Sequence, residues 1–564
     1  MFKRYLLAAS LVLSTAFAQP LADLLPAETF FALGTKDLTS EQNRIQPFID
    51  EFNRLDLASS LSKVFSSETD TEAQTPLAIP EALQGLGPMD ILGQEAWLAV
   101  SASRFNPLPT LTLLSQLSDS ASANFDELLA KASEQEGVQM ETEGSINFYQ
   151  QLIESEGSPP VALAFAKQDS LLMLSTNPDT LRGVLRQLQG SSDPSFADSE
   201  GYKRTLAELD GSFMGYLDYA QLPEALASYT KGLGFDKLVE RLTDAFETAG
   251  VSAGVSRFTD TGMVSESYQA YDPKGKDKEL LELLRNPTQA DPGLKRFYAP
   301  TALGFSANPI NLAAWWNYLN GITESTPELG GSLDELLQSF TGINLQESLF
   351  SWTGEQFASS TTGASESPTP GVAASNLLGE QVFIIEVKDE AKARDGLASL
   401  FATASQGVAA FADPSGGSGN AASETKELNG VTVTSYEITS GVKLSYAITE
   451  GYALIATSDE ALSTVLSAAG DTGISTAIPT TARSYSLADN RRSMEASAEQ
   501  LVSQLQLAAG FGGASNLNFE AVDEASQKLE TYLQFIAERL GQTVSYSEQR
   551  PESIYSFSQS DISW

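Results

Sequence analysis

The sequence contains no cysteine and no histidine among its 564 residues. Without cysteine, disulfide bonds and thiol chemistry are excluded, although many exported bacterial proteins also lack cysteine, so the compartment stays open. Without histidine, Ser-His-Asp and Cys-His catalysis are excluded. A bound metal would have to be a hard cation held by oxygen ligands, such as calcium or magnesium, because imidazole and thiolate ligands are missing.

Basic residues are scarce: 34 lysines and arginines stand against 73 aspartates and glutamates, a formal net charge of −39. Such a chain repels polyphosphates and anionic membrane surfaces, which argues against nucleic acid as a main partner. Cations, basic proteins and neutral surfaces remain compatible with this charge. Hydrophobic residues make up 42% of the chain, enough for packed cores, and the length predicts two or more domains.

The chain also lacks an apolar run long enough to span a membrane. Its N-terminus has two basic residues, a short apolar run from Tyr5 to Leu13, and small residues at Ala16 and Ala18. This pattern predicts a secretory signal peptide over residues 1–18, cleaved after Ala18. We therefore expect a soluble mature protein in the periplasm or outside the cell, with no integral membrane segment after signal removal.

One supersecondary pattern occurs twice. The two stretches are "FAKQDSLLMLSTNPDTLRGVL", Phe165 to Leu185, and "YAITEGYALIATSDEALSTVL", Tyr446 to Leu466. Each reads as strand, tight turn, strand and helix. Thr176 with Asp179, and Thr457 with Glu460, have the spacing of a capping box, which predicts where each helix begins. Residues identical in register are Ala166/Ala447, Thr176/Thr457, Leu181/Leu462, Val184/Val465 and Leu185/Leu466.

Further segments match between the halves in the same order. The pairs are "LTLLSQ" with "VFIIEV", "QEAWLAVSA" with "GEQFASST", "PAETFFALGT" with "PTALGFSANP", and the helix–hairpin stretch beginning "KLVERLTDAF" with that beginning "KLETYLQFIA". The sequence thus predicts a tandem duplication of an α+β unit, with repeats at residues 19–290 and 291–564 and a linker at Leu284 to Gly293. Each repeat is expected to be a mostly antiparallel sheet packed by helices.

Several motifs resemble the domain-of-unknown-function-3352 family of exported or membrane-anchored bacterial proteins. They are "LADLLPAETFFALGT", "SFADSEGYKRTLAEL" leading into "FMGYLDYAQL", "FIIEVKDEAKARDGL" and "GYALIATSDEALSTVL". The resemblance implies the fold and export over nearly all of the mature chain. It implies no activity and no site residues, because these motifs carry the fold rather than chemistry. The chain departs from anchored members in its cleavable-looking signal.

Two serine motifs match sequence patterns of catalytic nucleophiles. "GVSAG" places Ser252 in a Gly-x-Ser-x-Gly pattern, but the nucleophile elbow needs a strand before the serine and a helix after it, and here a helix comes first. Ser60 and Lys63 match Ser-x-x-Lys, yet they lie in a stretch with a helical apolar stripe. We interpret both motifs as structural, and we expect no catalytic residue at either.

Three other kinds of site were also considered. A pair of carboxylates could hydrolyse glycosides without histidine, but no pair stands out among so many acids. The glycines of Gly510 to Ser515 lack the preceding strand and the lysine of a phosphate-binding loop. Asp413, Ser415 and Glu424 only faintly match a calcium loop, because Ser418 stands where glycine is needed. We expect no metal, and we expect surface loops at Ser66 to Pro76, Ser359 to Ser375 and Ala412 to Glu424.

Trp315 and Trp316, with Tyr318 nearby, are the most unusual side chains. Adjacent tryptophans could form a stacking platform for a sugar or an apolar ligand. Neighbours on a helix point about 100° apart, so we favour one tryptophan in the core and the other half-buried at an interface.

The sequence leads to three hypotheses. The favoured one is an exported, soluble, non-enzymatic envelope protein that binds or scaffolds an apolar ligand, a cation or an envelope protein, with the cleft between the repeats as the expected site. The alternatives are a carboxylate-dependent hydrolase of cell-wall or extracellular polymer, and a purely structural surface component. No catalytic, cofactor-binding or metal-binding residue is assigned.

Overall fold

The computed structural model describes most of the chain. The described residues are 20–57, 59–60, 88–92, 94–102, 109–132, 137–153, 161–223, 236–286, 288–324, 331–363, 380–412, 423–439, 442–468, 478–496, 498 and 519–564. The predicted signal peptide, the loop at 66–76 and the Gly510 to Ser515 loop lie outside them. The fold is α+β, with one large antiparallel sheet and helices.

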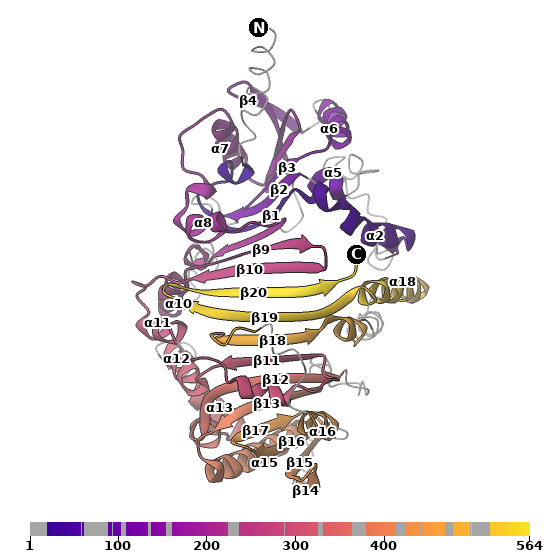
Figure 1. The fold of residues 1–564 in the computed structure, drawn as a ribbon. Helices are drawn as coiled ribbons and strands as arrows, with labels where there is room; N and C mark the ends of the chain where they lie inside the picture. Colours follow the sequence, from indigo (N-terminus) through magenta and orange to yellow (C-terminus); the bar gives the residue numbers. More distant parts are fainter. Residues whose placement is uncertain are drawn as a thin grey trace.

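In the described part of the chain, twenty strands form one continuous sheet, and every strand pair is antiparallel (Figure 1). At about 4.8 Å per strand the sheet is about 90 Å long. At its centre, strand β10 pairs with β20, so segments far apart in the sequence lie side by side there.

The first half of the chain supplies the strands on one side of this central pair. From the centre outward they are β10 (Gly262–Ala270), β9 (Val251–Thr259), β8 (Phe213–Asp218), β1 (Thr29–Lys36), β2 (Glu95–Ser101), β3 (Thr110–Gln116), β7 (Leu171–Ser175), β6 (Val161–Gln168), β5 (Ile146–Ile153) and β4 (Val138–Glu143).

The second half supplies the strands on the other side. From the centre outward they are β20 (Ser553–Ile562), β19 (Leu540–Arg550), β18 (Ser484–Asp489), β11 (Gly304–Pro309), β12 (Thr353–Gly363), β13 (Glu380–Val387), β17 (Tyr452–Ala456), β16 (Val442–Thr449), β15 (Val431–Thr439) and β14 (Ser423–Leu428).

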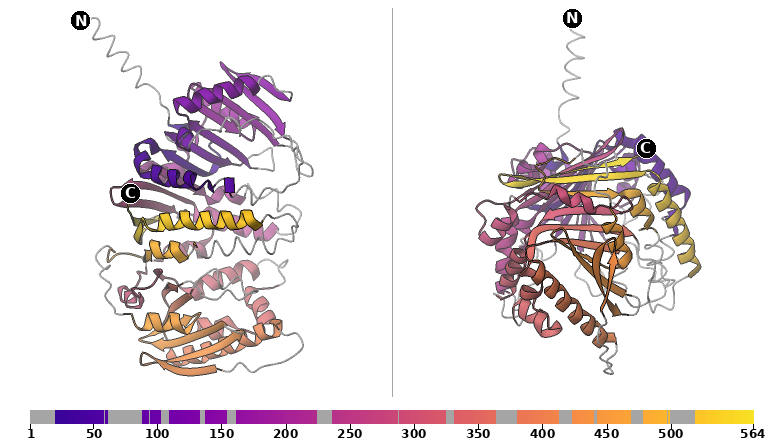
Figure 2. Two further views of the ribbon diagram at one scale, coloured as in Figure 1. Left: turned by 90° about the vertical axis from the view of Figure 1, so that its right-hand side faces the viewer. Right: turned by 60° about the horizontal axis from the view of Figure 1, so that its bottom comes forward.

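Helices cover parts of both faces and line both sides of the sheet (Figures 1 and 2). The α-helices are α2 (Gln42–Arg54), α5 (Pro88–Leu92), α6 (Asp119–Ala132), α7 (Pro178–Leu188), α8 (Glu200–Arg204), α10 (Asp236–Ala249), α11 (Lys278–Leu284), α12 (Leu312–Glu324), α13 (Leu333–Thr341), α15 (Glu390–Ala412), α16 (Asp459–Leu466) and α18 (Phe519–Ala537). In Figure 1, α10, α11 and α12 lie along one side of the strands, and α2 and α18 lie along the other.

Short helical turns connect these elements. The 3₁₀ turns are η1 (Leu21–Asp23), η2 (Leu38–Glu41), η3 (Phe196–Asp198), η4 (Leu206–Glu208), η5 (Tyr219–Gln221) and η6 (Pro292–Phe297), and η8 (Gln346–Phe350) is a single π turn.

Residues paired across neighbouring antiparallel strands point to the same face, so the register defines two faces of the sheet. We call the side to which Ser265 of β10 points the inner face, and the other side the outer face. The main cores lie on the outer face. In the first half, Trp97, Phe148 and Phe196 pack there with α7, and in the second half Phe305 and Leu454 pack there with α16.

Among the described residues, two small cores lie on the inner face, near the two ends of the sheet. There α6 packs Phe125 and Leu128 against β7, and α15 packs Leu397 and Phe401 against β15, β16 and β17. The middle of the inner face, from β3 to β11, lies outside both of these smaller cores, and Phe357 of β12 packs against the second.

The stretches that occur twice in the sequence fold as strand, hairpin turn, strand and helix, as predicted. Gly451 has the left-handed φ of 82° that a tight turn requires. The predicted caps were wrong by one residue: Asn177 and Ser458 are the N-caps, accepting hydrogen bonds from the backbone N–H groups of Asp179 and Ala461.

Thr176 and Thr457 have a different structural role. The Thr176 hydroxyl accepts a hydrogen bond from the N–H of Leu111 at 2.9 Å. The Thr457 hydroxyl accepts one from the N–H of Gln381 at 3.0 Å. Each threonine therefore ties the end of its hairpin to the neighbouring strand, which a local capping pattern could not reveal.

Among the predicted turns and loops, some are confirmed and one is wrong in its bounds. The two predicted helix–hairpin stretches form α10 with β9 and β10, and α18 with β19 and β20, with turns at Asp260 and at Pro551. The loop predicted from Ser359 was wrong at its start, because residues 359–363 extend β12 and pair with β11 and β13. In the predicted linker, Ala290 is buried in the second-half core, as is Leu294 directly after the linker.

Candidate binding surface on the inner face

A straight row of serines crosses the middle of the inner face. Seven adjacent strands each place a serine opposite the serine of the next strand. In order from β9 to β12, the row is Ser256, Ser265, Ser558, Ser545, Ser486, Ser306 and Ser359. The row crosses the centre of the sheet, so residues from both halves of the chain build it.

A second, shorter row runs beside the first. It consists of Ser267, Ser556, Ser547 and Ser484 on β10, β20, β19 and β18. We call the inner face of β9, β10, β20, β19, β18, β11 and β12 the serine region. Rows lie two residues apart along each strand, about 6.8 Å, and neighbouring strands are about 4.8 Å apart, so the hydroxyls form a regular lattice.

Several hydroxyls in this lattice are hydrogen-bonded in pairs. Ser256 bonds Ser265 at 2.7 Å, and Ser545 donates to Ser558 at 2.9 Å. Further pairs are Ser306 with Ser359 at 2.9 Å, Ser484 with Ser547 at 2.6 Å, and Thr543 with Ser560 at 2.6 Å. A hydroxyl can donate once and accept twice, so each paired serine keeps capacity for a ligand.

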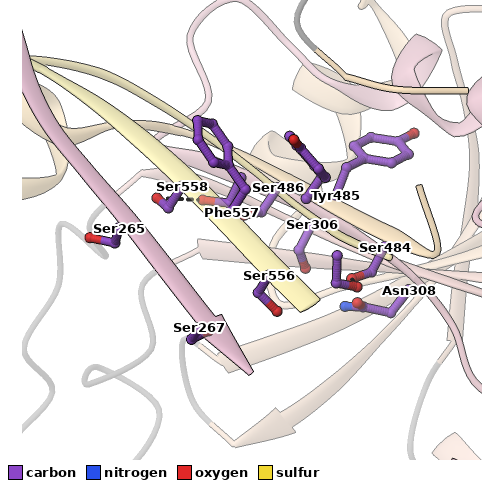
Figure 3. Close-up of a pocket in the computed structure, with 13 residues that line it drawn as sticks. Ser265, Ser267, Ser306, Asn308, Ser484, Tyr485, Ser486, Ser556, Phe557 and Ser558 are labelled. Carbon is purple, nitrogen blue, oxygen red and sulfur yellow. Dashed lines mark hydrogen bonds between the residues drawn. The ribbon is translucent and has the colours of Figure 1, made fainter. Parts of the chain in front are cut away.

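A pocket of about 310 Å³ lies on the serine region (Figure 3). Its side chains are serines from β10, β20, β19, β18 and β11, together with Asn308. Tyr485, Tyr546 and Phe557 also line it, but they alternate with the serines along their strands, so their rings belong to the outer face. Figure 3 shows the Phe557 ring and the Ser556 side chain on opposite sides of β20.

At the described strand positions from β3 to β11, the inner face carries no charged residue. On β12, Glu355 occupies the same set of alternate positions as Phe357 and Ser359, and its carboxylate accepts a hydrogen bond from the Thr288 hydroxyl at 3.2 Å. The outer face of the central strands is different. There Arg257 donates to Glu266, the Tyr555 hydroxyl donates to Glu266 at 2.8 Å, and the Arg550 guanidinium lies over the ring of Tyr555. In a chain with a net charge of −39, the two faces of the central strands therefore differ in charge.

Beside the serine region, the same face becomes apolar. We call the inner face of β3, β2, β1 and β8 the leucine region. Its most exposed members are Leu33, Leu98 and Leu111, with 49%, 39% and 45% of their side chains exposed. Leu33 and Leu98 are cross-strand neighbours, and Phe31 and Leu217 are another pair on this face. Contiguous exposed leucines on a sheet face are typical of a binding site.

Aromatic rings border this surface at one end of the strands. Phe213 and Phe258 meet edge to face, and Phe258 meets Trp564 with ring centres 5.1 Å apart. Trp564 in turn contacts Phe48 of α2, which contacts Phe535 of α18. Because Phe213 and Phe258 lie on the inner face, α2 and α18 lie on that side as well.

At the other end of the strands, α10 and α12 approach the inner face. Gln269 of β10 points to that face and donates to the carbonyl of Ala249, the last residue of α10. Leu312 of α12 packs against the core beneath α15, beside Phe357. Helices on both sides thus flank the serine region, which forms the floor between them.

The serine motifs found in the sequence do not form a nucleophile site. Ser252 is the second residue of β9, which follows α10 after Gly250, the helix-then-strand order that the sequence indicated. Ser60 is buried, and its hydroxyl accepts a hydrogen bond from Lys528 of α18 at 2.8 Å. Lys528 also pairs with Glu524, so its ammonium acts as a donor, and Lys63 lies outside the described residues.

Two carboxyl groups with a raised pKa, those of Glu95 and Asp218, lie on the outer face, away from the pocket. Burial raises the pKa of Glu95, which accepts hydrogen bonds from the Trp97 indole and the Leu21 N–H, both at 3.0 Å. Burial also raises the pKa of Asp218, bound by Gln221 and the Ala220 N–H. Both carboxyls have their partners within the fold, so they serve structure rather than substrate.

The two adjacent tryptophans are both half-buried and both have partners. Trp315 packs with Tyr318 in a small core between α10, α11 and α12. Trp316 donates to Asp334 of α13 at 2.8 Å and contacts the ring of Phe350. Neither tryptophan therefore provides a free stacking platform. Of the calcium-like loop, only Glu424 is described, in β14, and no cluster of potential metal ligands occurs in the described ranges.

Residues 92–508 match the family model described as "Protein of unknown function (DUF3352)". The chain belongs to the DUF3352 family. No curated protein and no solved structure matches it. Among the residues that the structure describes, no helix has both the length and the apolar character required to cross a membrane. The family assignment agrees with the resemblance that the sequence motifs indicated.

The serine region was not predicted from the sequence, although a signal was present. Two serines stand two residues apart on each of four strands, at 545 and 547, 556 and 558, 265 and 267, and 484 and 486. Alternation shows that these serines share a face of their own strand. The pairing of β10 with β20 and of β18 with β11, which aligns them in rows, is long-range and could not be read from the sequence.

Proposed function

We propose that this DUF3352 protein is an exported, non-enzymatic envelope protein that binds an uncharged, partly apolar ligand on the inner face of its sheet. The observation that carries this proposal is the surface from β3 to β11, whose described strand positions carry no charged residue, with leucines exposed at one end and a serine-lined pocket in the middle. The charged outer face of the same central strands shows that sheet geometry alone does not require this composition.

We further propose that the binding surface arose by tandem duplication of an α+β unit. Each half follows the same strand order from the centre outward, and each has one helix, α7 or α16, after its matched hairpin. The central β10–β20 pairing joins the last strands of the two halves. A duplicated unit joined in this way places equivalent strands on both sides of the serine pocket and makes one long surface from two short sheets.

Export is proposed from residues 1–18, whose basic residues, apolar run and small residues fit a signal peptide. The alternative, a carboxylate-dependent hydrolase, finds no support at the pocket, which no aspartate or glutamate lines. Glycoside hydrolysis needs two carboxyl groups facing one another across the scissile bond.

Native mass spectrometry of the protein purified from its own envelope tests the binding proposal. We expect a mass shift from a co-purifying small molecule, and we expect organic extraction to remove the shift. A double substitution of Leu33→Asp and Leu98→Asp should abolish it. A bare polypeptide mass from gently prepared envelope, unchanged after incubation with apolar ligands, would overturn the proposal. N-terminal sequencing of the same material tests cleavage after Ala18.

A further inference from the structure

The inner face joins two surfaces of different chemistry without a break. We propose that it is a two-part site for a membrane lipid with a neutral, hydroxyl-rich head, such as a glycosyl diacylglycerol, with the acyl chains on the leucine region and the head on the serine region. This inference rests on the proposed binding function and names its ligand class.

The leucine region fits acyl chains in chemistry and in size. Leu33, Leu98 and Leu111 are each more than a third exposed, and covering such side chains contributes roughly 25 cal/mol per Å² of apolar surface. The region spans four adjacent strands, about 14 Å at 4.8 Å per step. Half of a bilayer's hydrocarbon core, the depth that one lipid's chains occupy, is about 15 Å.

The serine region fits a head group that both donates and accepts hydrogen bonds. Its two rows contain only hydroxyl side chains, each able to act in both roles. Sugar and glycerol hydroxyls have the same capacity, so they can pair with the rows in many registers. Asn308 adds an amide at the edge of the pocket.

Charge argues against an anionic head. Phosphate and carboxylate groups are bound in proteins by arginine, lysine or backbone N–H groups at helix N-termini. The described strand positions of this face from β3 to β12 include no lysine or arginine, and the chain's net charge of −39 repels anions from the outset. The site thus selects lipids by the neutrality of the head, and the leucines distinguish a lipid from a free sugar.

Lipid extraction from vesicles tests the proposal directly. The full mature chain is incubated with phosphatidylcholine vesicles that contain a small fraction of acyl-labelled monogalactosyl diacylglycerol or of acyl-labelled phosphatidylglycerol. After the vesicles are removed, the fluorescence bound to protein is measured. We expect at least about tenfold more galactolipid than phosphatidylglycerol in the protein fraction.

Two double variants separate the two parts of the site. Leu33→Ser with Leu98→Ser should reduce extraction of both lipids about tenfold. Ser545→Val with Ser558→Val removes two hydroxyls and their mutual hydrogen bond, and should bring extraction of the two lipids close to equal. Leu152→Ser is the matched control, because Leu152 is 55% exposed but lies on β5, outside this face, and it should extract both lipids like the unmodified chain. Circular dichroism checks that each variant is folded. If the double variant of Leu33 and Leu98 is unfolded, the single variant Leu111→Ser replaces it.

The outcomes distinguish the two proposals. Equal extraction of both lipids by the unmodified chain would overturn the head assignment and leave the binding proposal standing. Competition by free galactose at concentrations that match the galactolipid would overturn a lipid in favour of a glycan. Failure to extract either lipid, together with no co-purifying ligand, would overturn both proposals.

Discussion

The leucine and serine regions lie on one face of one sheet, and neither has a charged residue at the described strand positions from β3 to β11, yet their chemistry is opposite. β1 and β11 are each the fourth strand from the centre. On the inner face, β1 presents Phe31 and Leu33 where β11 presents Ser306 and Asn308. Strand pairing thus determines where each side chain points, and residue choice alone decides whether the place is apolar or hydroxylated.

The two regions also differ in what supports them from behind. Behind the leucine region, on the outer face, is a dry core that includes Trp97 and Phe196. Behind the serine region around β10 and β20 is a half-exposed set of ion pairs and rings, with Glu266 bound by Arg257 and Tyr555. The leucine region therefore depends on core packing, and the centre of the serine region depends on polar contacts.

The largest effect is expected from Trp97→Ala. Trp97 is 1% exposed, and replacing such a core aromatic with alanine costs about 3–5 kcal/mol. Hydrogen exchange followed by mass spectrometry should show lost protection in β1, β2 and β3, with protection of β18, β19 and β20 unchanged. Equal loss in both regions would contradict the independence of their supports.

Local sequence patterns predicted some of these features and missed others. The hairpins, the helical faces and the segment around Trp97 were predicted because period-2 and period-3.6 patterns are local. The helix caps were misplaced at Thr176 and Thr457, because both threonines bond to strands distant in sequence. The serine rows were missed for the same physical reason: their alignment depends on long-range pairing.

Two glycines, Gly34 on the outer face and Gly215 on the inner face, allow a matched test of the two sides of the leucine region. A Cβ on Gly34 would lie 2.8 Å from the Trp97 ring, whereas one on Gly215 would meet only Leu33 at 3.9 Å. Gly34→Ala should therefore cost about 1–3 kcal/mol through overpacking. Gly215→Ala should stabilise by about 0.4–1 kcal/mol, because it lowers the entropy of the unfolded chain. Chemical denaturation measures both, and the same sign for the two variants would contradict this assignment of faces.

As the pH falls, the ion pair behind the serine region should lose its stabilising contribution before the core behind the leucine region is affected. The Arg257 guanidinium, and then the Tyr555 hydroxyl, hold the pKa of Glu266 below its ordinary value. A lowered pKa stabilises the fold above the unfolded-state value of about 4.3, and this contribution is lost as the pH falls through the folded-state value. Unfolding temperatures measured from pH 7 to pH 3 should converge for the unmodified chain and Glu266→Gln. Parallel curves would show that Glu266 does not carry the effect.

The smallest predicted effect concerns the hydroxyl pairs that distinguish the serine region from the leucine region. Ser256 and Ser265 share a hydrogen bond of 2.7 Å, and such a bond contributes about 0.5–1.5 kcal/mol net. A double-mutant cycle of Ser256→Ala and Ser265→Ala should give a coupling energy in the lower part of that range. As a control, Ser256→Ala and Ser484→Ala should be additive, because the Ser484 hydroxyl pairs with Ser547 instead. The leucine side chains have no hydroxyl groups and cannot form such hydrogen bonds. A coupling energy near zero for Ser256 and Ser265 would therefore mean that the two regions differ in polarity but not in side-chain hydrogen bonding.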